Sequence, residues 1–297
     1  MIRLRDFNWR RLLAILVALF AVAAAILIPL WRSAIDRNLH RQIAEPFRIA
    51  GNLFYVGGSD SSSFLITGPD GDVLIDSGRA GTADMIVTSI TKLGFDIRDV
   101  KVLLNSAPRG DHAGALADLQ QASGAQLWAS EASAPVLAAG GDDPDFFFPI
   151  RFLVRSGLLR YPAPRVDHQF KDGETIRLGT TSVTAHITAG YTRGCTSYSF
   201  QVRDAKRLLN VVSACSFGAV EVSRYAEQAA DLKNSIRVLR SLPADIWVTS
   251  QLVVWNGYFK LLGRATAKNA ADPFIDPEGY RSYIDAGETR YLRDLVK

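Results

Sequence analysis

The stretch Asn105-Ser106-Ala107-Pro108-Arg109-Gly110-Asp111-His112-Ala113-Gly114 decides the fold of this chain, because it joins two segments of different periodicity. The segment before it, 100–104, is a short apolar run, which predicts a buried strand. The segment after it, 111–121, has apolar residues at helical spacing and a closing Gly124, which predicts a helix. Loops that leave a buried strand and begin a helix commonly carry the chemistry of α/β proteins. We therefore expect Asp111 and His112 to lie at a functional site.

The composition fits a globular body with an ordinary surface charge. Hydrophobic residues make up 48% of the 297 residues, enough for one large domain or two modest ones. The formal net charge is +4, and residues 1–31 contribute +3 of it, which leaves +1 for the rest of the chain. Because the body is nearly neutral, we expect no nucleic-acid partner.

The N-terminus contains an apolar run, 12–31, of 20 residues without a charge. At 1.5 Å per residue a helix of this length spans about 30 Å, the thickness of a bilayer core. A cleaved signal sequence is the alternative, since 21–23 has a small-x-small pattern, but the apolar run continues beyond it. We predict a transmembrane anchor or signal sequence over 1–31, a tether over 32–46 and a domain over 47–297.

The side of the membrane follows from the basic flank. Arg10 and Arg11 precede the apolar run and favour an N-terminus inside the cell. The sequence therefore predicts a membrane-anchored protein whose domain is extracytoplasmic, in the periplasm. Secretion after signal cleavage is the alternative.

The body of the chain alternates between strand and helix patterns. Strands are expected over 48–56, 62–67, 72–76, 100–104, 126–129, 174–178, 183–188, 196–202, 207–212 and 246–249. Helices are expected over 82–93, 111–121, 131–139, 225–242 and 278–296. The order of strands followed by helices occurs twice, which predicts an α/β protein with two packed sheets and helices outside them.

Two further features leave alternatives open. Residues 142–166 form an aromatic, proline-containing insertion, which is either an irregular loop on the core, an apolar wall over a pocket, or a surface resting on a membrane. Cys195 and Cys215 either form one disulfide in an oxidising compartment or are two small buried side chains.

Several motifs in a fixed order make the sequence resemble the metallo-β-lactamase fold family, most closely its third subclass. The landmarks are Gly68-Pro69-Asp70-Gly71 to Asp76-Ser77-Gly78, the loop ending Asp111-His112-Ala113-Gly114, Glu131-Ala132-Ser133-Ala134, Lys171-Asp172-Gly173, the segment 188–196, and Pro243-Ala244-Asp245-Ile246. The resemblance covers residues 46–295. It implies an αββα metallo-β-lactamase-like sandwich with a zinc site at one edge, between the sheets. It also implies that Ser213 and Cys215 line the pocket.

The resemblance also implies a zinc ligand set, which this sequence carries only in part. The family loop reads H-x-H-x-D-H, and two further histidines lie later in the chain. Asp111 and His112 match the last two positions of the loop. The four histidine positions that are replaced fall on Ala107, Arg109, Tyr191 and Gln251.

The replacements change the chemistry of the site. Alanine offers no donor atom, and arginine stays protonated and cannot bind a metal. We expect Arg109 to place a fixed charge near the position of a zinc ion and to pair with Asp111. Tyr191 and Gln251 are weak candidate ligands, the first as a phenolate and the second through a neutral oxygen. The candidate metal ligands are therefore Asp111 and His112, with these two as weak additions, and Asp111 is the candidate catalytic residue.

Three functions compete. The first is a membrane-anchored relative of zinc hydrolases with lost or altered metal-dependent catalysis, which binds a small-molecule ligand with no zinc or with zinc at low affinity. The second is an active hydrolase that opens a β-lactam or a related cyclic amide or ester, with a single metal at Asp111, His112 and Gln251. The third is a membrane-tethered interaction protein that uses the insertion 142–166.

Overall fold

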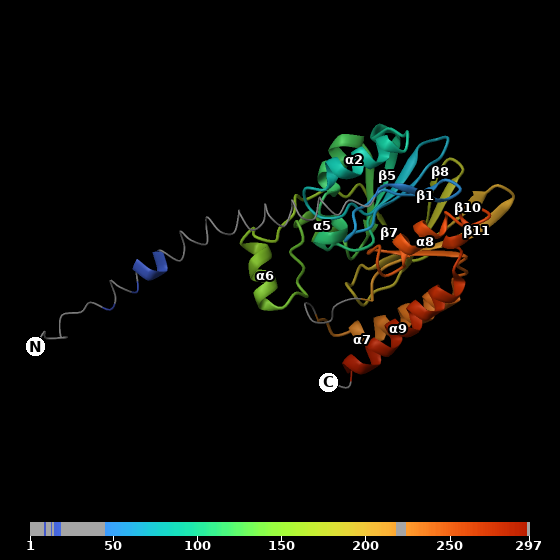
Figure 1. Ribbon diagram of the computed structural model, residues 1–297. Helices are drawn as coiled ribbons and strands as arrows, with labels where there is room; N and C mark the ends of the chain where they lie inside the picture. Colours follow the sequence, from blue (N-terminus) through green and yellow to red (C-terminus); the bar gives the residue numbers. More distant parts are fainter. Residues whose placement is uncertain (1–8, 10–12, 14, 19–44, 218–223, 296–297) are drawn as a thin grey trace, which may run out of the picture. The chain divides into compact units, whose positions relative to one another are not determined.

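The computed structural model describes residues 9, 13, 15–18, 45–217 and 224–295 (Figure 1). The chain divides into two compact units, residues 1–42 and 43–297. Among the described residues no helix is long and apolar enough to cross a membrane. Most of the predicted apolar span, including all of 19–31, lies outside the described residues.

Twelve described strands form two sheets in the second unit, as the sequence predicts. The first sheet has the order β1-β2-β3-β4-β5-β6-β7, with strands Phe47–Ala50, Leu53–Tyr55, Phe64–Ile66, Asp72–Ile75, Val100–Leu104, Gln126–Ser130 and His168–Phe170. The second has the order β12-β11-β10-β9-β8, and these strands are Ile246–Thr249, Arg207–Ala214, Thr196–Asp204, Thr181–Ile187 and Thr175–Leu178. Strands β4, β5, β6 and β7 are parallel neighbours, so their carboxyl ends meet at one edge.

Helices cover the outer faces of both sheets (Figure 1). The described α-helices are α2 (Ala83–Lys92), α3 (Gly110–Ala113), α4 (Leu116–Ser123), α5 (Ala134–Ala138), α6 (Phe148–Arg155), α7 (Gln228–Ser241), α8 (Gly257–Gly263) and α9 (Pro277–Leu295). In Figure 1, α2 and α5 lie on one side of the sheets, while α7 and α9 lie side by side on the other.

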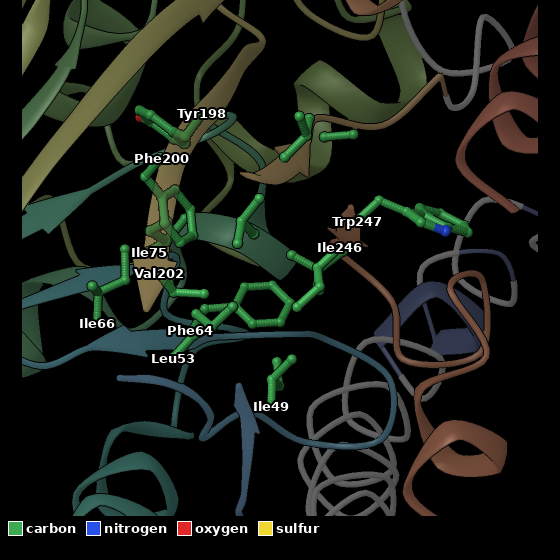
Figure 2. Close-up of a cluster of buried hydrophobic side chains, with 14 of the residues drawn as sticks. Ile49, Leu53, Phe64, Ile66, Ile75, Tyr198, Phe200, Val202, Ile246 and Trp247 are labelled. Carbon is green, nitrogen blue, oxygen red and sulfur yellow. The ribbon is translucent and has the colours of Figure 1, made fainter. Parts of the chain in front are cut away.

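Strand β4 contributes side chains to two hydrophobic cores, one between the sheets and one under the outer helices. Successive side chains of a strand point to opposite faces, and all four residues of β4 are buried. Val73 and Ile75 belong to the core between the sheets, whereas Leu74 packs with the helices outside. Figure 2 shows the inner core, in which Phe64 of the first sheet lies near Val202 and Ile246 of the second. A strand buried on both faces reads as a continuous apolar run, as Val73-Leu74-Ile75 does here.

Three expected elements differ from the structure. The single helix expected over 111–121 is two short helices, α3 and α4. The single strand expected over 48–56 is a tight hairpin of β1 and β2, because Gly51 turns the chain with a φ of 52° beside the Arg203 carbonyl. The insertion 142–166 is not irregular throughout, since it contains α6, which has a proline in its first turn. Helix α8 lies in a segment for which no element is predicted.

Candidate functional site

The candidate site begins where parallel strands β4 and β5 end. Ile75 is opposite Leu104, so the residues that follow them, Asp76 and Asn105-Ser106, meet at the sheet edge. The Asp76 carboxylate accepts hydrogen bonds from the Ser106 backbone N–H at 2.8 Å and from Ser106 Oγ at 2.5 Å. Asp76 has a φ of 59°, a conformation that is unusual without glycine and is held here by these buried bonds.

His112 is fixed by this carboxylate. Its Nδ1 lies 3.0 Å from Asp76 Oδ2 and 2.8 Å from Ser106 Oγ, which orients the ring. The side chain is 1% exposed, and its Nε2 is buried, has no hydrogen-bond partner among the described residues and lies 3.9 Å from Asp111 Oδ2. Burial lowers the pKa of His112, but the charges of Asp111 and Asp76 outweigh it and raise the pKa overall.

The Asp76, His112 and Ser106 cluster is not a nucleophilic triad. In such a triad the carboxylate and the serine contact opposite ring nitrogens, so that the histidine can relay a proton. Here both oxygens lie at Nδ1, and Ser106 is 5% exposed. The cluster therefore positions His112, and Nε2 is the nitrogen left for chemistry.

Arg109 is held by the insertion. Its side chain is 5% exposed, and its Nη1 lies 3.3 Å from Asp143 Oδ2, whose side chain is 6% exposed. The guanidinium also lies 4.0 Å from the centre of the Phe146 ring. Tyr161, at the other end of the insertion, donates a hydrogen bond to the Pro108 carbonyl at 3.0 Å. The sequence predicts an ion pair between Arg109 and Asp111. In the structure, Arg109 forms an ion pair with Asp143 instead.

Ala107 lies against a disulfide. Cys195 and Cys215 are bonded, and both pack with buried Ala107 in a small cluster that also contacts Tyr191. The structure thus selects the disulfide from the two alternatives that the sequence leaves open. A bonded cysteine has no thiol, so Cys215 cannot act as a nucleophile.

Tyr191 is close to the ring of His112, with the ring centres 5.8 Å apart. Burial, and next the negative charge of Asp111, raise the pKa of the Tyr191 hydroxyl above its usual value of 10.0. Formation of a phenolate is therefore disfavoured here, and Tyr191 would bind a metal only if the ion itself lowered this pKa.

A cavity of about 420 Å³ brings the scattered candidates together. Gln251, which follows β12, lines it with Asp111, His112 and Tyr191. The remaining lining residues are Ser216, Phe217, Thr249, Ser250, Val254, Tyr283, Ala286, Gly287 and Arg290. Ser213 and Cys215 are not among them, and both side chains are buried.

The donor set does not fit the family's pair of zinc ions. Among the described residues no group of three or more His, Cys, Asp and Glu side chains is placed to hold a metal. The residues that the resemblance places at the first zinc site are an alanine, a buried arginine and a tyrosine whose hydroxyl pKa is raised. Near the second, Asp111 and His112 Nε2 are the charged and imidazole donors, and Gln251 adds only a neutral amide.

Sequence reasoning missed four residues that shape the site, namely Asp76, Ser106, Asp143 and Phe146. A signal for the first two existed, since parallel neighbouring strands bring their carboxyl ends together and both residues follow such strands. No comparable signal exists for Asp143 and Phe146. They reach Arg109 from an insertion more than 30 residues further along the chain, and the contact depends on how that insertion folds back.

Comparisons with known proteins agree with this architecture. The family model of the metallo-beta-lactamase superfamily matches residues 56–209, just over half of the chain. The chain is 37% identical to the Rm3 metallo-beta-lactamase, with 86% of this chain and 96% of that chain covered and a TM-score of 0.76. For native FEZ-1 from Legionella gormanii the identity is 34%, the coverage 86% and 96%, and the TM-score 0.78.

A third similar structure is the class B3 di-zinc metallo-beta-lactamase LRA-12 from an Alaskan soil metagenome. It is 31% identical, with 85% of this chain and 95% of that chain covered and a TM-score of 0.76. Family model, identity and near-complete coverage of these enzymes agree with the two sheets and the site described above. This chain belongs to the metallo-β-lactamase superfamily, and its structural neighbours are class B3 enzymes.

Proposed function

We propose that this chain is a metallo-β-lactamase-fold protein in which zinc-dependent hydrolysis is lost or altered and the cavity binds a small-molecule ligand. The observation that carries the proposal is the environment of Arg109, at the position of a family zinc ligand. Its guanidinium is buried, paired with Asp143 and stacked on Phe146. A permanent cation fixed there repels a metal ion, and Asp143 holds it in place.

The cavity itself supports a small-molecule ligand. Its volume of about 420 Å³ lies in the range of ligand pockets. Hydroxyl and amide groups of Ser216, Thr249 and Gln251 line one part, and Phe217 and Val254 add apolar surface. This mixture suits a compact ligand with several hydrogen-bonding groups.

Membrane anchoring through residues 1–31, with the domain in the periplasm, is part of the proposal. It is supported by the uncharged run of 20 residues over 12–31 and its basic flank. The disulfide between Cys195 and Cys215 fits the same compartment, because disulfides persist in oxidising environments such as the periplasm.

A single-metal hydrolase is the second candidate. It is favoured by one observation: His112 Nε2 is buried, accepts or donates no hydrogen bond within the described part of the chain and lies 3.9 Å from Asp111 Oδ2, and Gln251 lines the same cavity. Such an enzyme would open a β-lactam or a related cyclic amide or ester.

Metal content and turnover of the full-length protein separate the two candidates. The detergent-solubilised chain is incubated with zinc, dialysed and analysed for bound metal, and β-lactam hydrolysis is then measured with and without chelator. We expect no retained zinc and no chelator-sensitive hydrolysis. Stoichiometric zinc, together with turnover that disappears on chelation and in Asp111→Ala, would overturn the proposal.

Ligand binding is tested separately with intact and ring-opened β-lactams as probes. A bound probe raises the melting temperature of the protein, because it stabilises only the folded state. Gln251→Trp, which fills the cavity from an exposed position, should abolish the rise without lowering the melting temperature of the free protein. Identical shifts in the variant would show that the probes bind elsewhere.

A further inference from the structure

The insertion carries an exposed aromatic stripe on α6. Phe148 and Phe152 are 81% and 60% exposed, and they lie four residues apart, on the same face of the helix. Their ring centres are 6.2 Å apart, so the two side chains form one apolar surface. Val154, on another face, is buried. Neither phenylalanine lines the cavity at the candidate site.

Basic side chains flank this stripe. Arg151 and Arg155 share a single carboxylate, that of Asp142, at 3.1 and 2.9 Å, so the trio retains a net positive charge. Arg160, which follows the helix, is exposed and adds to it. A helix with exposed phenylalanines beside arginines matches the chemistry of the headgroup region of an anionic bilayer.

We propose that α6 is an interfacial helix, which inserts Phe148 and Phe152 between the headgroups of an anionic bilayer and so docks the domain on the membrane. The inference rests on the proposed membrane anchor and goes beyond the proposed ligand binding. A face of two aromatic rings binds a bilayer weakly by itself. The tether 32–46 has 15 residues and reaches at most about 50 Å, so the anchor keeps α6 at a high effective concentration near the surface.

A second exposed apolar group lies at α8, where Tyr258, Phe259 and Leu262 are exposed. Val254, which precedes this helix, lines the cavity, so this group borders the candidate site. In Figure 1, α6 and α8 lie at different sides of the domain. The two helices therefore provide a matched comparison, since only one of them is expected to contact lipid.

The test uses the full chain, reconstituted into phosphatidylcholine vesicles that contain phosphatidylglycerol. A single cysteine is introduced at one of two exposed positions, Ser156→Cys or Thr266→Cys, and labelled with an environment-sensitive fluorophore. The first lies four residues after Phe152 and the second four residues after Leu262. We expect a blue shift and quenching by brominated lipid for the label at 156, and neither for the label at 266.

Further variants identify the groups responsible. Phe148→Ser combined with Phe152→Ser should abolish the quenching at 156, and the fold should persist because both side chains are exposed. Omitting phosphatidylglycerol should weaken the quenching at 156, because the arginines then lack an anionic lipid to bind. Unquenched label at 156, equal quenching at both positions, or a chain that does not float with the vesicles would each overturn the proposal. None of these readings depends on zinc or on the cavity.

Discussion

Arg109 lies at a position where the family resemblance predicts a zinc-binding histidine. A histidine at a metal site is neutral and donates a lone pair, whereas a guanidinium is permanently charged and has no lone pair to give. The structure resolves the resulting problem of a buried cation through Asp143 and Phe146, both from the insertion. The arginine is therefore a structural link between the loop and the insertion.

This link predicts a large loss of stability in Arg109→Met, which leaves the Asp143 carboxylate buried without its cation. Breaking a buried pair in this way costs about 3–5 kcal/mol. Asp143→Asn should recover part of the loss in the double variant, and urea unfolding of all four proteins measures the coupling. Arg155→Met is the control, since that side chain is 59% exposed and its pair with Asp142 should contribute less than about 1 kcal/mol. Equal losses in both single variants would contradict the assignment.

His112 makes stability depend on pH. Its pKa in the folded protein is raised above the unfolded value of about 6.5, so its protonation stabilises the fold. That contribution is fully present below about pH 6.5 and is lost as the pH rises through the folded-state pKa. The free energy of unfolding of wild type should therefore decline relative to that of His112→Gln over this window.

His186 is a control, because its contribution to stability should change with pH in the opposite direction. Burial lowers the pKa of this histidine, whose Nε2 lies 2.7 Å from Ser199 Oγ. A lowered pKa destabilises the fold at low pH, so wild type should gain stability relative to His186→Gln as the pH rises. The same trend in both variants would contradict the environments described here.

At the scale of elements, the disulfide joins the residue before β10 to the residue after β11. These strands are antiparallel neighbours, and the cross-link lies at the end of the pair nearest the candidate site. It holds the second sheet against the loop that contains Ala107, through the cluster the three residues form.

Removing the cross-link should destabilise the protein without changing its fold. For Cys195→Ala combined with Cys215→Ala, which opens a loop with a sequence separation of 20, we expect a loss of about 3 kcal/mol. Chemical denaturation with and without reductant measures it. Reductant should lower the stability of wild type and leave that of the double variant unchanged. If the denaturation curve of the wild type is the same with and without reductant, the disulfide is absent from the protein.

At the scale of the whole molecule, the fold is that of its class B3 neighbours, and the proposed change lies in the side chains of the centre. Asp76 orients His112, and Asp111, Tyr191 and Gln251 line one cavity. If only the ligands are lost, histidines at the four replaced positions should restore metal binding. The variant carries Ala107→His, Arg109→His, Tyr191→His and Gln251→His, with Asp143→Asn to remove the carboxylate that would otherwise be unpaired.

We expect this variant to retain up to about two zinc ions per chain after dialysis, as the family's two sites require. Elemental analysis measures the metal, and Asp111→Ala in the same background should lower the content, because it removes a ligand of the second site. A folded variant that retains no zinc would show that the frame has changed as well as the ligands.

The sequence by itself determined the α/β architecture with two sheets, and it predicts which ligand positions are changed. Both depend on local patterns: burial on both faces makes Val73-Leu74-Ile75 of β4 and Val102-Leu103-Leu104 of β5 apolar, and the motif places Ala107 and Arg109 at fixed steps from Asp111. Only the tertiary structure decided the partner of Arg109, the disulfide, the helix within the insertion and the cavity that joins Gln251 to His112. The physical reason is distance along the chain. Contacts between segments far apart in sequence form through the packing of the whole domain, and local periodicity carries no record of them.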